Sequence, residues 1–384
     1  MKKRISILGS TGSIGKKTLE IIRKDKKNFK VVLLSTNKNI KLISKQIKEF
    51  RVKNVIISNY KSYLYIKKKF KNINIRNNFD NLEKILKTKV DYTMSAISGF
   101  DGLKPTLNII KHTKVIAIAN KESIICGWKL IKKEIKKNCV EFIPIDSEHY
   151  SIWSVIKDID TKNIDQVILT ASGGPFLNNK KKKTPKTAAN HPNWKMGQKI
   201  SIDSATLMNK VFEIIEAKKI FNIELKKFKI LIHPKSYVHT IIKFKNGLIK
   251  IVAHDTDMKI PIFNSLYVNT SKFIKTKKIN IEILNNLNFT EVDLKKFPLA
   301  RLIKKVPKND TMFETLLVTI NDELVNLFLN NKIKFDEIAS KLNTLIDSNT
   351  FSNFKYKKLN NLKQIQKLNN FVRLKTKTLS VISH

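Results

Sequence analysis

The sequence predicts an α/β fold in three parts: an N-terminal Rossmann-like, doubly wound sheet, a central α+β catalytic domain and a C-terminal helical domain. Short apolar runs alternate with segments of helical periodicity from residue 4 to residue 119, which is typical of a parallel sheet with helices on its faces. A glycine-rich loop follows the first run. The expected boundaries are a nucleotide-binding domain at 1–145, a catalytic domain at 146–266 with a lid loop at 172–197, a linker at 267–293 and a helical domain at 294–384.

Each element is expected from its local periodicity. In the N-terminal part the expected strands are 4–8, 29–34, 54–58, 73–76, 92–96, 115–119 and 140–143. The expected helices are 14–23, 41–50, 60–70, 81–87 and 103–111. In the central part we expect strands at 166–170, 228–232, 238–244 and 248–253, and a helix at 204–220.

The amino-acid composition excludes several classes of protein. The chain has 384 residues, of which 42% are hydrophobic, and this excludes a disordered protein. Its two cysteines, Cys126 and Cys139, exclude a disulfide scaffold and fit a reducing compartment, so a cytoplasmic protein is expected. No apolar run reaches the roughly 18 residues of a membrane span, and no membrane partner is expected.

The net charge of +44 often indicates a nucleic-acid or anionic membrane partner. Here the lysines are spread over the whole length and accompany frequent Asn and Ile. This joint bias favours a nucleotide-composition effect at tolerant surface positions. No zinc-finger spacing or aromatic–basic RNA-binding motif is present. We therefore expect no nucleic-acid partner, while a small acidic substrate suits the charge.

The glycine loop reads Gly9-Ser10-Thr11-Gly12-Ser13-Ile14-Gly15. Glycines let the backbone approach a phosphate, and the following helix N-terminus offers free N–H groups. An NAD site usually has an acid at the end of the second strand, about 20 residues on, whereas this chain has Ser35-Thr36-Asn37-Lys38-Asn39 there. The missing acid and the cation favour NADP, although Lys38 by itself is equally well explained as a solvated lysine.

Two acidic residues follow the strand expected at 140–143. In an extended chain Asp146 and Glu148 point to one side and Ser147 to the other. Two carboxylates on one side suit a hard divalent cation. Taken alone, such a pair is more often a solvated turn.

A third carboxylate, Glu213, lies on the expected central helix. Asp203 or Ser204 is expected to cap that helix. Asn209 and Lys210 share a face with Glu213, because they are four and three residues away. The alternative is an ordinary amphipathic helix with a solvated Lys–Glu pair.

The stretch 172–197 has almost no apolar periodicity and is expected to be a long surface loop that acts as a lid or a binding loop. Ser172 stands beside glycines whose backbone amides suit an anion. Trp194 lies in a polar segment, where an exposed aromatic residue suggests a cover over a ligand. Three further histidines are expected to be structural: His233, His239 and His254.

Six motifs occur in the order in which one known family carries them. They are GSTGSIG (9–15), ANKES (119–123), DSEH (146–149), SGGPF (172–176), HPNWKMG (191–197) and DSATLMNKVFE (203–213). Together they resemble the 1-deoxy-D-xylulose 5-phosphate reductoisomerase family. Beyond residue 265 the resemblance is mostly in length and helical character.

The resemblance implies an activity. The family rearranges and reduces 1-deoxy-D-xylulose 5-phosphate to 2-C-methyl-D-erythritol 4-phosphate in the non-mevalonate (MEP) pathway, with NADPH and one Mg²⁺ or Mn²⁺ ion per subunit. It implies a retro-aldol/aldol isomerisation, in which the metal stabilises the developing charge, and then hydride transfer from NADPH. A homodimer is also implied.

The resemblance also implies residue roles. The metal ligands would be Asp146, Glu148 and Glu213, which form the catalytic set together with Lys121. The substrate would contact Lys121, Ser147, Glu148, Ser172, His191, Trp194, Ser204, Asn209, Lys210 and Glu213. NADPH would contact Thr11, Gly12, Ser13, Ile14, Asn37, Lys38, Asn39, Asn120, Glu122 and Gly197. Trp194 and Met196 would close the lid.

Two positions depart from the family pattern. Asn37 stands where the family usually has Gly, and Asn tolerates a positive φ better than most residues. Tyr150 follows DSEH where a smaller or more polar residue is usual.

Two other functions stay open. One is a different NADPH dehydrogenase, which would not need three carboxylates. The other is a catalytically inactive or nucleic-acid-binding relic, which only the net charge suggests.

Overall fold

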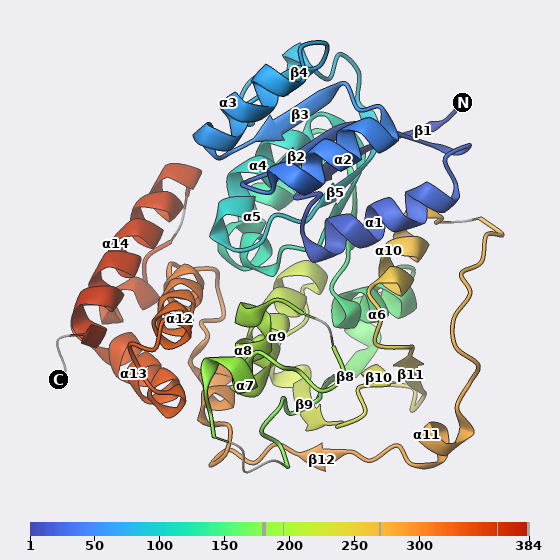
Figure 1. The fold of residues 1–384 in the computed structure, drawn as a ribbon. Coiled ribbons are helices and arrows are strands. Elements are labelled where there is room, and N and C mark those ends of the chain that lie inside the picture. Colours follow the sequence, from blue (N-terminus) through green and yellow to red (C-terminus); the bar gives the residue numbers. More distant parts are fainter. Residues whose placement is uncertain (179–181, 195, 269, 359, 382–384) are drawn as a thin grey trace. The chain divides into compact units, whose positions relative to one another are not determined.

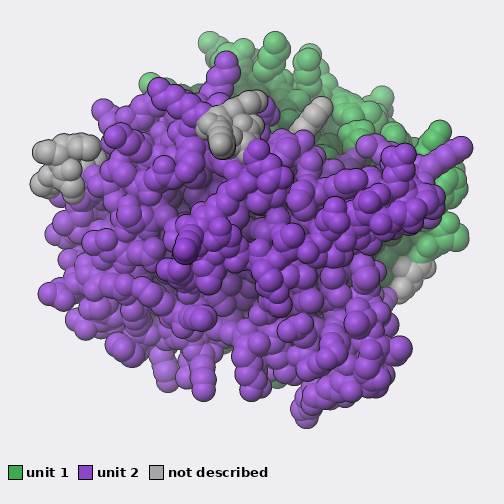
Figure 2. All heavy atoms as spheres, turned by 90° about the horizontal axis from the view of Figure 1, so that it is seen from below, with its two compact units in different colours: residues 1–150, 258–275 green, residues 151–257, 276–384 purple. Residues whose placement is uncertain are grey.

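The computed structural model describes residues 1–178, 182–194, 196–268, 270–358 and 360–381 (Figure 1). The chain forms two compact units, which Figure 2 shows in green and purple. Unit 1 is residues 1–150 with 258–275, and unit 2 is residues 151–257 with 276–384. The four-part division by sequence range stays a prediction. No helix of the described residues is long and apolar enough to cross a bilayer.

Unit 1 contains a parallel seven-stranded sheet, and the predicted Rossmann-like fold is thereby confirmed. Its strands are β1 (Lys3–Leu8), β2 (Phe29–Thr36), β3 (Asn54–Ile57), β4 (Asn74–Arg76), β5 (Val90–Ser95), β6 (Thr113–Ile118) and β7 (Glu141–Pro144). The helices that connect them are α1 (Ser13–Lys24), α2 (Ile40–Phe50), α3 (Tyr60–Lys69), α4 (Leu103–Ile110) and α5 (Lys121–Lys137).

The strand order, β4-β3-β2-β1-β5-β6-β7, places a switch point between β1 and β5. The chain starts at β1, moves outward to β4, and returns to the other side of β1 with β5 (Figure 1). Ligands of such sheets bind beyond the carboxyl ends of the strands at this point. The glycine loop directly follows β1, so it lies where a nucleotide is expected.

Two elements of unit 1 differ from the prediction. The helix expected at 81–87 is a single 3-10 turn, Leu82–Lys84, which is entered from Asn81 in the left-handed region (φ 53°). Helix α5 is not among the predicted helices, although Ile124, Trp128 and Ile131 recur at helical spacing and are buried. Its first turn carries part of the ANKES motif.

Unit 2 contains a mixed five-stranded sheet of order β11-β10-β8-β9-β12. Its strands are β8 (Ile164–Ala171), β9 (Phe228–Ile232), β10 (Val238–Phe244), β11 (Ile249–Ala253) and β12 (Thr290–Glu291). Strands β8 and β9 are parallel, and the other pairings are antiparallel.

Helices α6 (Ser147–Ile156) and α9 (Met208–Phe221) contribute to the core of unit 2. Ile152 and Ile156 of α6 share one buried cluster with Ile214 of α9 and Leu169 of β8. The division between the units falls inside α6.

The prediction of one helix at 204–220 is wrong. Helix α8 (Gln198–Ala205) ends there, and α9 begins at Met208 after Leu207 in the left-handed region (φ 62°). The Thr206 hydroxyl donates to the carbonyl of Ile202 at 3.1 Å, which closes the last turn of α8. Asp203 and Ser204 therefore end one helix instead of capping the next.

The C-terminal region is helical, which confirms that part of the fold prediction. The remaining α-helices are α7 (Pro185–Ala188), α10 (Lys259–Leu266), α11 (Ile281–Asn285), α12 (Phe313–Leu329), α13 (Phe335–Asp347) and α14 (Leu362–Val381). Helix α12 is buried along most of its length and packs against α8, α13 and α14.

Candidate active site

The glycine loop packs closely against the backbone at Ala96 and is hydrogen-bonded to helix α2. Gly9 has a positive φ of 81°, and a Cβ there would lie 2.5 Å from the carbonyl oxygen of Ala96. The Ser10 hydroxyl donates to Oε1 of Gln46 at 2.8 Å, and Nε2 of Gln46 donates to the Ser10 carbonyl at 2.9 Å. The sequence analysis does not predict a role for Gln46. The one feature of the sequence that could have indicated such a role is the position of this amide on the apolar face of a helix.

The other predicted NADPH contacts of this region surround the ends of β1 and β2. The hydroxyls of Thr11 and Thr36 lie 2.7 Å apart. Asn39 caps α2 by accepting a backbone N–H at 3.1 Å, and Lys38 beside it is exposed. Three more predicted contacts stand at the start of α1: Gly12, Ser13 and Ile14.

Asn120, Lys121 and Glu122 lie at the start of α5, one residue after the end of β6. Asn120 Oδ1 accepts a backbone N–H of α5 at 2.5 Å, and its amide donates to the carbonyl of Gly99 at 2.8 Å, which ties the loop after β5 to α5. Nζ of the buried Lys121 lies 3.1 Å from Oδ2 of Asp146. Glu122 is buried in the same turn.

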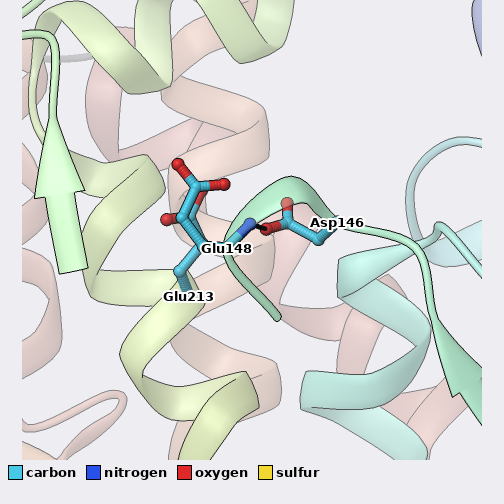
Figure 3. A group of neighbouring side chains, drawn as sticks. All are labelled: Asp146, Glu148 and Glu213. Atoms are coloured by element: carbon cyan, nitrogen blue, oxygen red, sulfur yellow. Dashed lines mark hydrogen bonds between the residues drawn. The ribbon is translucent and has the colours of Figure 1, made fainter. Parts of the chain in front are cut away.

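The structure brings Asp146, Glu148 and Glu213 together. Each offers a carboxylate oxygen, and these oxygens lie within 4.8 Å of one another (Figure 3). The extended geometry predicted for Asp146 and Glu148 is wrong, because α6 begins at Ser147 and Oδ1 of Asp146 accepts the N–H of Glu148 at 3.2 Å. An Asp before the first turn stabilises a helix start in this way.

The donor set of this cluster fits a hard divalent cation. Glu148 and Glu213 are buried, and Ser147 Oγ donates to Oε2 of Glu148 at 2.5 Å. Nζ of Lys210 lies 2.5 Å from Oε2 of Glu213, whose other oxygen accepts the side-chain amide of Asn209. Within the described part of the chain, no other group of three His, Cys, Asp or Glu residues is arranged to hold a metal.

Ser172, His191 and Ser204 form a second cluster, which we call the hydroxyl cluster. Ser172 follows β8, His191 follows α7, and Ser204 lies in the last turn of α8. Oγ of Ser172 lies 2.8 Å from Nε2 of His191 and 3.4 Å from Oγ of Ser204. It also accepts the N–H of Gly174 at 3.1 Å.

The hydrogen bonds of His191 determine its tautomer. Nδ1 accepts the backbone N–H groups of Asn193 and Trp194 at 3.1 Å each, so the ring proton is on Nε2 and is donated to Ser172. Burial, together with the charge of Lys210, lowers the pKa of His191 to about 4. His191 is therefore a neutral donor, and Lys210 is close enough to act on it electrostatically.

The surface loop predicted at 172–197 contains regular structure. It contains α7, which Thr184 caps, and Phe176 is buried. Residues 179–181 and 195 lie outside the described residues.

Trp194 is half-buried, and its ring meets the ring of His239 edge to face, with the centroids 6.0 Å apart. The preceding Asn193 donates to the carbonyl of Pro234 at 2.6 Å. Trp194 is thus anchored to the turn between β9 and β10. Met196 is half-buried, and Gly197 is exposed at the start of α8.

Both departures from the family pattern fit the structure. Asn37 is not among the described residues with a positive φ, so the absence of Gly causes no backbone strain there. Tyr150 is half-buried on α6, and burial raises its pKa to about 12, so its hydroxyl is neutral.

Family models match the chain in three segments. The model of 1-deoxy-D-xylulose 5-phosphate reductoisomerase matches residues 5–127. A model of the C-terminal domain of the same enzyme matches residues 142–221, and a second DXP reductoisomerase C-terminal domain model matches residues 254–375.

Individual proteins agree with these models. The chain is 56% identical over 387 residues to the reductoisomerase of Pelagibacter ubique (strain HTCC1062), covering 99% of this chain and all of that one. A crystal structure of DOX-P reductoisomerase with NADPH, fosmidomycin and magnesium is similar with a TM-score of 0.90 and 31% identity, covering 99% and 98% of the two chains. The Zymomonas mobilis enzyme in complex with NADPH gives a TM-score of 0.88 and 29% identity over the same shares. Because these matches span the sheet domain, both clusters and the helical region, the chain belongs to the 1-deoxy-D-xylulose 5-phosphate reductoisomerase family.

Proposed function

We propose that the protein converts 1-deoxy-D-xylulose 5-phosphate to 2-C-methyl-D-erythritol 4-phosphate in the MEP pathway, with NADPH and a divalent metal ion. The observation that carries the proposal is the convergence of Asp146, Glu148 and Glu213 within 4.8 Å. Hydride transfer alone needs no such cluster, whereas a carbon–carbon rearrangement beside a ketone does benefit from a cation. Relatives solved with NADPH and with magnesium support both cofactors.

Asp146, Glu148 and Glu213 would hold Mg²⁺ or Mn²⁺. The bound ion supplies Lewis acidity toward the ketone and hydroxyl oxygens of the substrate. The buried Lys121 beside Asp146 orients that carboxylate and offers a cation to the substrate. Ser147 orients Glu148 through its hydroxyl and would also contact the substrate backbone.

NADPH would lie across the carboxyl ends of β1, β2 and β6. The loop residues Thr11 to Ile14 would bind its pyrophosphate at the N-terminus of α1. The exposed residues 37–39 would meet the ribose phosphate, and no Asp or Glu is present there to repel it. Two further contacts would come from the start of α5 and one from the start of α8: Asn120, Glu122 and Gly197.

The hydroxyl cluster would bind the substrate phosphate. Ser172 already accepts from His191 and from a backbone N–H, so its own proton is available for an anion. Ser204 adds a second hydroxyl 3.4 Å away. Asn209 and Lys210 at the start of α9 would add an amide and a positive charge. Trp194 and Met196 would cover the site and exclude water.

A homodimer in the cytoplasm completes the proposal. Leu248 and Ile249 are 59% exposed and Ile251 is 53% exposed, at the β11 edge of the sheet of unit 2. Apolar residues on an exposed edge strand suit pairing with a second copy, and the two free thiols suit a reducing compartment. Light scattering on an Ile251→Lys variant should give a monomer where the wild type gives a dimer. A monomeric wild type would contradict this part.

The activity is tested by following NADPH oxidation with purified protein, 1-deoxy-D-xylulose 5-phosphate and MgCl₂. We expect turnover that EDTA abolishes and Mg²⁺ restores, with higher kcat/KM for NADPH than for NADH. Turnover that survives EDTA would favour a metal-independent dehydrogenase.

A further inference from the structure

Helix α12 forms a polar network with Asp203 of α8, the residue next to Ser204 of the hydroxyl cluster. The fully buried Asn321 of α12 donates from Nδ2 to Oδ1 of Asp203 on α8 at 2.8 Å. Asp203 is 2% exposed, and Nζ of Lys199 lies 3.0 Å from its other oxygen and 2.9 Å from Oδ1 of Asp322. Each oxygen of the Asp203 carboxylate thus has a partner.

The position of Asp203 determines that of Ser204, the next residue in the last turn of α8. Gly174 packs closely against this turn on one side, because a Cβ on Gly174 would lie 2.7 Å from Cα of Ala205. Leu207, in the left-handed region, leads directly into α9. A displaced end of α8 would therefore move the Ser204 hydroxyl away from the rest of the hydroxyl cluster.

We propose that Asn321 is a positioning residue for the phosphate site, acting through Asp203 on Ser204. The inference rests on the proposed function, since it assumes that the hydroxyl cluster binds the substrate phosphate. It gives the C-terminal helical region a role in substrate binding, although none of the predicted ligands lies there. A purely structural hydrogen bond would stabilise the fold without changing substrate affinity.

The test compares wild type, Asn321→Ala, Asp203→Asn and the double variant Asn321→Asp with Asp203→Asn. KM and kcat for 1-deoxy-D-xylulose 5-phosphate, KM for NADPH and Tm are measured for each. Each single change should raise the sugar-phosphate KM about tenfold, because small misplacements of binding groups are costly, and should leave the NADPH KM unchanged. The double variant exchanges donor and acceptor, and should return KM to within about twofold of wild type.

Asn369→Ala is the matched control. Asn369 of α14 is 4% exposed, and its Nδ2 donates to Oγ1 of Thr319 on α12 at 2.9 Å. Its loss should lower Tm to a similar extent and leave KM unchanged. If Asn321→Ala does not fold, Asn321→Ser and the double variant carry the same comparison.

The positioning role is overturned if Asn321→Ala raises KM no more than Asn369→Ala does, or if the double variant fails to restore KM. An inactive wild type would instead contradict the proposed function. In that case the affinity of the same variants for inorganic phosphate is measured by calorimetry. Equal phosphate affinity in wild type and Asn321→Ala overturns the positioning role.

Discussion

Nζ of Lys210 lies 2.5 Å from Oε2 of Glu213, and both side chains are buried. One residue belongs to the proposed phosphate contacts and the other to the proposed metal ligands, three positions apart on α9. The pair therefore differs from the solvated Lys–Glu pair of an ordinary amphipathic helix, and it links a proposed phosphate contact to a proposed metal ligand.

Lys210→Ala should raise KM for the sugar phosphate about 10- to 100-fold, because a hydrogen bond to a charged group contributes about 1.5–3 kcal/mol. The Mg²⁺ concentration for half-maximal activity should not rise, since the three carboxylates remain and Glu213 loses a competing cation. Steady-state kinetics at varied substrate and varied Mg²⁺ measure both effects.

Lys218→Ala is the control for this variant, because Lys218 lies on the same helix and donates to the carbonyl of Pro307 at 2.8 Å. It should leave both constants unchanged. A wild-type KM in Lys210→Ala would remove Lys210 from the phosphate site.

Gln46→Leu should weaken NADPH binding. The change removes both hydrogen bonds that Gln46 makes with Ser10, and so loosens the glycine loop. We expect the NADPH KM to rise about tenfold, as for other misplaced binding groups, with the sugar-phosphate KM unchanged. Glu49→Gln on the same helix, which removes the carboxylate charge that pairs with Arg23 and Lys26 at the surface, should change neither. An unaltered NADPH KM in Gln46→Leu would show that the loop keeps its shape without this residue.

His191 should lower the free energy of unfolding as the pH is reduced from 6.5 to 4. Its pKa is lowered to about 4 in the folded protein, so in this window the unfolded chain binds the proton more readily and unfolding becomes easier as the pH falls. At pH 5 the loss should be about 2 kcal/mol, because one pKa unit corresponds to about 1.4 kcal/mol. Denaturant unfolding of wild type and His191→Gln at pH 7 and pH 5 measures this loss in the free energy of unfolding. Equal pH dependence in the two proteins would show that His191 has an ordinary pKa.

The sequence predicts the sheet domain well because its information is local. Alternating apolar runs and helical segments identify β1 to β7, and the loop of Gly9 to Gly15 indicates the nucleotide site without any tertiary contact. Helix α5 is missed even though its buried residues have helical spacing, because the polar ANKES residues at its start hide the pattern.

Tertiary structure decides what the sequence cannot predict. The break at Leu207 depends on a left-handed residue that no periodicity reveals. Asp146 and Glu148 lie at the start of a helix and not in the predicted extended segment. Their oxygens lie within 4.8 Å of a carboxylate oxygen of Glu213, which is 65 residues further along the chain than Glu148. Gln46 and Asn321 act on residues 36 and 118 positions away, so only the folded chain shows their partners.

The central claim is that Asp146, Glu148 and Glu213 hold one metal ion used in catalysis. Asp146→Asn, Glu148→Gln and Glu213→Gln each leave the size of the side chain nearly unchanged and remove one charge. Glu83→Gln, at an exposed carboxylate of unit 1, is the control.

The most direct measurement is Mg²⁺-dependent oxidation of NADPH by these variants with 1-deoxy-D-xylulose 5-phosphate, with NADPH affinity determined in parallel by fluorescence titration. Each of the three changes should reduce kcat by at least about 100-fold, because electrostatic stabilisation of developing charge contributes about 3 kcal/mol or more per group. NADPH affinity should stay within about twofold of wild type, since the glycine loop is unchanged, and Glu83→Gln should behave as wild type. Wild-type turnover at limiting Mg²⁺ in any one of the three variants would contradict the account.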